Sequence, residues 1–268
     1  MGRISAAFRR LKKGNEAALV PYLTVGYPSL EATRQLLPVI ARQGADMIEL
    51  GVPFSDPLAD GATIQRTSQV ALENGVSLAD CLRVAAEARR SNEVPLLLMS
   101  YYNPLLRYGL DALAEDCAEA GVDGLIVPDL PPDEAAELKG ELDGKGVDLI
   151  FLLAPTSTDE RIRRVAEMAS GFIYCVSLTG VTGARSEVSS GLSDFLARVR
   201  SHTDLPLVVG FGISTPEQVE HVSGIADGVV VASALMNHIE GLPEDELVIG
   251  VSEFVRALKE RTALGVRE

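Results

Sequence analysis

The chain has little of the chemistry on which several protein classes depend. Its 268 residues contain no tryptophan, only three cysteines and three histidines, and 24 basic residues against 38 acidic ones. The formal charge of −14 offers no positive field to attract phosphate backbones or anionic lipids, so we expect no nucleic-acid and no membrane partner. Apolar runs of membrane-spanning length are also missing.

The scattered cysteines and histidines argue against a covalent or metal framework. Cys81, Cys117 and Cys175 form an odd set without the spacing of a disulfide scaffold or a metal motif. No histidine is spaced with another ligand as metal sites require, so we expect no metal. We expect reduced core thiols in a cytoplasmic protein. The basic segment from Ile4 to Lys13 has no apolar signal core after it, which favours an extra N-terminal packing helix.

The sequence is rich in a regular alternation of short apolar runs and amphipathic segments. Eight runs, most too short for helices, cover residues 18–25, 47–52, 95–100, 124–128, 148–154, 171–177, 206–212 and 228–234. Helical patterns between them cover residues 30–43, 78–91, 110–120, 132–145, 158–170 and 216–223. Eight such units predict an α/β fold, a (β/α)₈ TIM barrel in which residues 1–268 form a single domain.

The spacing of the eight runs is uneven. They start 29, 48, 29, 24, 23, 35 and 22 residues apart, so the excess length follows the second and the sixth run. In this fold the loops after the strands build the active site. We therefore expect long loops after strands 2 and 6 to act as lids, and a tolerated surface insertion is the alternative.

The segment from Glu49 to Asp60 carries the strongest chemical signal. Residues 46–50 alternate with period two, which places Met47 and Glu49 on one face of a strand. Burial among apolar neighbours would raise the pKa of Glu49 toward the value that a general acid or base needs near neutral pH. With Asp60 across a polar loop, the pair predicts proton transfer. Singly, Glu49 could hold a loop and Asp60 could cap a turn or helix.

The last two strands predict an anion site. The seventh run leads into residues 210–216 and the eighth into residues 232–234, which open a further helix. In TIM barrels these loops commonly bind phosphate at a helix N-terminus. Neither loop contains Lys or Arg, so backbone N–H groups and the helix dipole would hold the anion. Gly180 and Gly183 in the sixth loop permit sharp turns, although each glycine alone is as consistent with packing.

Five short sequence motifs, at the predicted strands and the loops that follow them, resemble the tryptophan synthase alpha subunit family. They are PYLTVGYP (21–28), ELGVPFSDP (49–57), DG (60–61), GVTG (180–183) and GFGIS (210–214), in the right order along nearly the whole chain. The resemblance implies cofactor-free retro-aldol cleavage of indole-3-glycerol phosphate to indole and glyceraldehyde 3-phosphate. It also implies an α2β2 heterotetramer, in which a beta subunit receives indole for the last step of L-tryptophan biosynthesis.

The resemblance also implies roles for the matching residues. Glu49 would move protons between the glycerol hydroxyl and the indole carbon, and Asp60 would accept a hydrogen bond from the indole N–H. Thr182 would close toward Asp60. The substrate-binding positions are Tyr22, Tyr174, Thr182, Gly183, Phe211, Gly212, Ala232 and Ser233.

Two of these positions depart from the family pattern. Ala232 stands where the family commonly has glycine, and its methyl group could crowd the phosphate. Tyr22 stands where some members have phenylalanine, which adds a hydroxyl that needs a partner when it is buried. We expect Tyr22 to be tolerated without a change of substrate.

Two other functions stay open at this level. A sugar-phosphate isomerase or an indole-glycerol-phosphate synthase has the same fold, but an isomerase commonly has an aspartate near the first strand, where this chain has residues 22–24. A barrel that only activates a beta subunit would dock through residues 53–57 and 101–106. A structural role is equally open for Asp129, and packing is the favoured role of Tyr101 and Tyr102.

Overall fold

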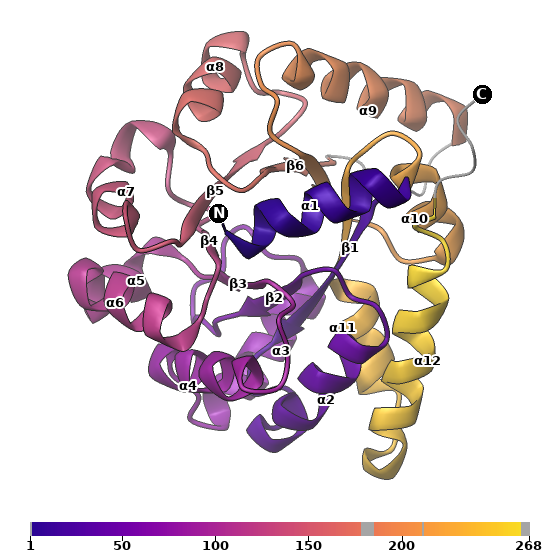
Figure 1. Ribbon diagram of the computed structural model, residues 1–268. Helices are drawn as coiled ribbons and strands as arrows, with labels where there is room; N and C mark the ends of the chain where they lie inside the picture. Colours follow the sequence, from indigo (N-terminus) through magenta and orange to yellow (C-terminus); the bar gives the residue numbers. More distant parts are fainter. Residues whose placement is uncertain (1, 178–184, 211, 264–268) are drawn as a thin grey trace.

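Eight parallel strands close into a barrel in the computed structural model, which describes residues 2–177, 185–210 and 212–263 (Figure 1). The strands are β1 (Ala18–Thr24), β2 (Ile48–Gly51), β3 (Leu96–Met99), β4 (Gly124–Ile126), β5 (Asp148–Leu153), β6 (Ile173–Val176), β7 (Leu207–Gly210) and β8 (Gly228–Val231). Each pairs with the next, and β8 pairs with β1 so that Gly228 lies opposite Ala18. The predicted TIM barrel is confirmed, and every predicted run contains one strand.

Helices surround the strands in chain order (Figure 1). They are α1 (Arg3–Gly14), α2 (Leu30–Arg42), α3 (Ala62–Glu73), α4 (Leu78–Arg89), α5 (Tyr102–Tyr108), α6 (Leu110–Ala120), α7 (Ala136–Leu142), α8 (Asp159–Met168), α9 (Arg185–Arg200), α10 (Pro216–Ser223), α11 (Ser233–Glu240) and α12 (Leu247–Lys259), with 3₁₀ turns at Pro132–Glu134 and Glu244–Glu246. Helices occupy all six predicted segments. Ser77 and Thr215 cap α4 and α10 with capping boxes, and both helices begin at the residues predicted for them.

The long connection after β2 contains an additional helix. Residues 52–61 form a loop, and α3 follows before the regular helix α4. The buried face of α3 includes the hydroxyl residues Thr67 and Ser68, which weaken the apolar period that identifies a helix from sequence. The connection after β3 also contains an additional helix, because α5 occupies much of the predicted loop 101–106. The connection after β6 includes residues 178–184, outside the described ranges.

The N-terminal helix closes one end of the barrel. In Figure 1, α1 lies across the strands, and its Ile4, Phe8 and Leu11 side chains are buried. Ile4 reaches the barrel interior, since a Cβ built on Gly124 would lie 3.1 Å from it. Phe8 meets Phe172 edge-on, with ring centroids 6.0 Å apart. The opposite end, where the strands finish, remains for the site.

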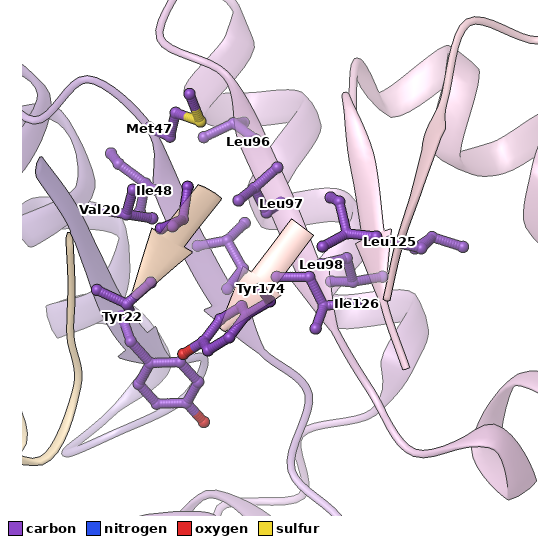
Figure 2. Packing of buried hydrophobic residues seen from close by; sticks show 14 of the residues in the cluster. Val20, Tyr22, Met47, Ile48, Leu96, Leu97, Leu98, Leu125, Ile126 and Tyr174 are labelled. Atoms are coloured by element: carbon purple, nitrogen blue, oxygen red, sulfur yellow. The ribbon is translucent and has the colours of Figure 1, made fainter. Parts of the chain in front are cut away.

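The barrel interior changes character along its axis. Leu97 of β3 and Ile150 of β5 fill the lower layer around Gly124. Nearer the carboxyl ends the inward side chains are Tyr22 and Tyr174, and Figure 2 shows both rings at the same end of the packed residues. The three cysteines are free and buried, as predicted. Within the described residues, no helix is long and apolar enough to cross a membrane.

Candidate active site

Glu49 lies on β2, opposite Tyr22 of β1 and Leu97 of β3. Its side chain is 1% exposed, and its Oε2 atom has no hydrogen-bond partner among the described residues. Burial, helped by the nearby charge of Asp60, raises the pKa of Glu49 to about 8. A carboxyl with this pKa can both give and take a proton near neutral pH, which suits acid/base catalysis.

Asp60 is half-buried at the end of the loop that follows β2. Burial raises its pKa to about 6, and a hydrogen bond from the Tyr101 hydroxyl works in the opposite direction. Asp60 is therefore mostly ionised at neutral pH and can accept an N–H. The helix α3 begins after Gly61 without a side-chain cap from the described residues, so Asp60 does not serve as its cap.

Tyr101 has more than the packing role that sequence suggested. Its hydroxyl oxygen accepts the backbone N–H of Ala59 at 2.8 Å, while its proton bonds Asp60. Its ring also packs against Phe54, with centroids 5.3 Å apart. Tyr101 thus fixes both the loop and its carboxylate. The available signal was its place just after β3, where barrel enzymes carry functional residues.

Asp129 takes the structural role that was left open for it. Its Oδ1 accepts the backbone N–H of Tyr102 at 2.8 Å, in the first turn of α5. Such an acceptor satisfies one of the N–H groups that a helix start leaves without an internal partner. Asp129 therefore supports α5 beside the site.

Tyr22 and Tyr174 form a wall of the site and depend on two glycines. A Cβ built on Gly51 would lie 1.9 Å from the Tyr22 hydroxyl, and one on Gly210 would lie 2.3 Å from the Tyr174 hydroxyl. Each phenol therefore occupies space that only a glycine on the next strand leaves open. Both side chains are buried, and burial raises the pKa of each phenol well above its usual value. Figure 2 shows the two rings close together in this view.

An open helix N-terminus lies at the end of β8. Ser233 is the first residue of α11, and no described side chain caps this helix. The first helical bond runs from the Met236 N–H to the Ala232 carbonyl at 3.1 Å, which leaves the preceding N–H groups outside the helix ladder. Ala232 has φ −108°, which is not the left-handed conformation that favours glycine. This N-terminus can hold an anion through backbone donors.

The loop after β7 is arranged differently. Gly212 has φ +75°, a left-handed conformation that favours glycine. The helix α10 that follows is closed by its capping box between Thr215 and Gln218. Thr182, Gly183 and Phe211, which are also predicted to contact substrate, lie outside the described residues. Of the ten predicted site residues, the structure therefore places seven, all near the carboxyl ends of strands.

These features define a class of protein: a (β/α)₈-barrel enzyme with a site suited to acid/base chemistry at the carboxyl ends of its strands. The two carboxyls come from β2 and the loop after it, and the phenols come from β1 and β6. In the described part of the chain, no group of three or more His, Cys, Asp or Glu side chains could hold a metal ion.

Comparisons with known proteins identify the family. The family model for the tryptophan synthase alpha chain matches residues 8–263. The tryptophan synthase alpha chain of Roseiflexus sp. (strain RS-1) is 55% identical over 260 residues, covering 97% of this chain and 100% of that protein. That of Citrifermentans bemidjiense is 52% identical over 267 residues and covers 100% of both. The chain belongs to the tryptophan synthase alpha chain family.

Solved structures agree with this assignment. A crystal structure of tryptophan synthase from M. tuberculosis, in an open form with BRD0059 bound, has a TM-score of 0.90 at 35% identity, covering 99% of this chain and 100% of that chain. The tryptophan synthase alpha chain of Legionella pneumophila subsp. pneumophila has a TM-score of 0.91 at 34% identity and covers 100% of both chains. Sequence and fold similarity thus extend over the whole barrel.

Proposed function

We propose that this chain cleaves indole-3-glycerol phosphate to indole and glyceraldehyde 3-phosphate, with Glu49 as the acid/base. The observation that carries the proposal is the buried Glu49 carboxyl, which has one oxygen without a described partner and a pKa raised to about 8. Asp60, with a pKa of about 6, supplies the second carboxylate. Family membership supplies the substrate.

The reaction follows from the two different protonation states. At neutral pH Glu49 is mostly protonated and gives its proton to the indole carbon that carries the glycerol chain. Positive charge then develops on the ring, and the ionised Asp60 stabilises it by accepting the indole N–H. The Glu49 carboxylate next takes the proton of the adjacent glycerol hydroxyl. The carbon–carbon bond breaks, its electron pair returns to the ring, and the aldehyde forms.

The phosphate is assigned to the ends of β7 and β8. The uncapped N-terminus of α11, beginning at Ser233, and the left-handed turn at Gly212 offer backbone donors there. Gly183 and Phe211 join this group on the basis of the family pattern, and Thr182 is assigned to closure over Asp60. Ala232 has a negative φ of −108°, so this position does not require the conformational freedom of glycine.

The partner is assigned as a tryptophan synthase beta subunit in an α2β2 heterotetramer. Support comes from two apolar side chains that flank the site: Leu58 in the loop after β2 is 85% exposed, and Leu106 on α5 is 48% exposed. Contact with a partner subunit would remove both side chains from water. A beta subunit docked there would receive the apolar product directly. The three unpaired buried thiols favour a cytoplasmic location.

Indole formation by purified protein tests the proposal. Wild type, Glu49→Gln and Asp60→Asn are assayed with indole-3-glycerol phosphate, each with and without a beta subunit, and Glu119→Gln on the exposed face of α6 is the matched control. We expect indole from wild type and control, faster with the partner, and a collapse in both site variants while they remain folded. Folded wild type that makes no indole even with the partner would refute the lyase and favour the partner-only role.

A further inference from the structure

The hydroxyl of Tyr22 is a polar group in a largely apolar wall. The side chain is 4% exposed, and the Thr24 hydroxyl donates a hydrogen bond to the Tyr22 oxygen at 3.3 Å. None of the described residues accepts the Tyr22 proton in return. A buried donor without an acceptor is unfavourable, so the proton is available for a bound molecule.

The neighbouring threonines set the direction of this proton. Thr24 lies 2.8 Å from the Thr67 hydroxyl of α3, and both threonines are fully buried. Thr67 has one hydroxyl proton, which it can give to the Ile64 carbonyl at 3.0 Å or to Thr24, and in the second arrangement the Thr24 proton is directed to the Tyr22 oxygen. A phenol O–H lies in the plane of its ring, so a lone pair held toward Thr24 turns the O–H to the opposite side.

The hydroxyl is placed beside both catalytic carboxyls. It lies over Gly51, where a Cβ would approach it within 1.9 Å, and Tyr22 is in register with Glu49. Burial first, and then the charge of Asp60, keep the pKa of Tyr22 well above its usual value, so the group remains a donor. The site therefore presents a neutral donor within electrostatic range of the Asp60 carboxylate.

We propose that Tyr22 is a specificity-determining residue that lets this chain favour an indole ring with a hydrogen-bond acceptor next to its N–H. The inference rests on the proposed function, in which Asp60 accepts the indole N–H. A ring with nitrogen at position 7 offers a donor and an acceptor on adjacent atoms, which complements Asp60 and Tyr22 together. Plain indole has no acceptor at that position.

The reverse reaction provides the test, with 7-azaindole as the probe and indole as the internal reference. Carbon 3 of either ring bonds to the aldehyde carbon of glyceraldehyde 3-phosphate, the ring carbon loses its proton, and the aldehyde oxygen gains one. The readout is the ratio of kcat/KM for 7-azaindole to kcat/KM for indole. Because each variant is assayed with both rings, the intrinsic difference in ring reactivity cancels when the ratios of two variants are compared.

We expect Tyr22→Phe to lower this ratio roughly three- to tenfold, the effect of one hydrogen bond in a buried site. Thr67→Val, which leaves the phenol but removes its support, should lower the ratio less, and it serves as the second variant if Tyr22→Phe folds poorly. Tyr108→Phe removes a hydroxyl that bonds Asp116 outside the site, and it should leave the ratio unchanged.

The outcomes separate the two claims. An unchanged ratio in folded Tyr22→Phe and Thr67→Val, with indole still condensed, overturns the specificity role and leaves the lyase assignment intact. Failure of folded wild type to condense indole refutes the proposed function and this inference with it. An equal fall of the ratio in Tyr108→Phe would also overturn the inference, because the effect would not then belong to the site.

Discussion

The two ends of the barrel treat a buried carboxylate in opposite ways. Just before β2, Asp46 accepts hydrogen bonds from Arg10 at 2.7 Å, from Lys259 at 2.8 Å and from the Leu19 backbone N–H at 3.0 Å. Three residues later, on β2 itself, Glu49 is just as buried, yet its Oε2 has no partner among the described residues. One acid is fully satisfied and the other is left reactive.

The satisfied pattern recurs at the lower end. Asp123, just before β4, accepts from Arg89 at 2.7 Å and from the Leu96 backbone N–H at 2.9 Å. Asp227, just before β8, accepts from the Leu207 backbone N–H at 2.8 Å and pairs with Arg200 at 3.0 Å. These acids tie helices to neighbouring strands. The paired acids and the unpaired one thus lie at opposite ends of the barrel, as the usual separation of stability and activity in this fold predicts.

The largest effect should come from removing the reactive acid. We expect Glu49→Gln to lower kcat about 10²–10⁴-fold, because the amide cannot transfer the proton that the carboxyl gives and takes. The fold should persist, since the isosteric amide fills the same space. Steady-state indole formation and far-UV circular dichroism measure the two properties. A folded variant with more than a tenth of wild-type kcat would contradict the role of Glu49.

The same substitution should change how stability depends on pH. The pKa of Glu49 is about 8 in the folded protein, against the ordinary value of 4.5 that applies to the unfolded chain. Between these pH values the folded state keeps a proton that the unfolded state loses. Wild type therefore loses stability as pH rises from about 5 to 8, by a few kcal/mol in order of magnitude, and Glu49→Gln should not. Denaturant unfolding at pH 5, 6.5, 8 and 9 measures the difference. A constant difference between the two proteins would show that Glu49 is not held protonated by burial.

Removing the charge of Asp46, at the end of the barrel where the acids are paired, should lower stability and leave activity nearly unchanged. We expect Asp46→Asn to lower the free energy of unfolding by about 2–3 kcal/mol, because Arg10 and Lys259 lose their charged partner, with partial compensation from solvent at the exposed Arg10. The kcat of the folded fraction should stay within about twofold of wild type, within the usual additivity of distant sites. Asp204→Asn, an exposed acid, is the matched control. A large loss of kcat in folded Asp46→Asn would break the division between the two ends.

The smallest effect should come from removing the hydrogen bond that Tyr101 donates to Asp60. Tyr101→Phe removes the hydrogen bond that lowers the pKa of Asp60, so this pKa should rise above about 6. We expect the acidic limb of the kcat/KM profile to move to higher pH, and kcat/KM at pH 7 to fall roughly three- to tenfold, the effect of one hydrogen bond. Tyr102→Phe, on the neighbouring position, is the control. An unshifted acidic limb would show that Tyr101 only packs.

Much of the fold could be predicted because its signals are local. The apolar runs that became β1 to β8 and the amphipathic segments between them are short patterns that a few neighbouring residues define. The Glu49 carboxyl was also recognisable, since its alternation with apolar residues places it on a strand face. The helix α3 was not predicted, because buried hydroxyl residues interrupt its apolar stripe.

The sequence by itself determined the eight repeating units, the strand-end position of Glu49 and the short loop that carries Asp60. Only the tertiary structure decided the partners: Tyr101 reaches a loop 42 positions away, and Tyr22 occupies the space above Gly51 on another strand. It also decided that Asp46 is paired with Arg10 and Lys259, while the Oε2 atom of Glu49 has no partner among the described residues. Secondary structure depends on neighbours in the chain, whereas these contacts form only when the closed barrel brings distant residues to the same end.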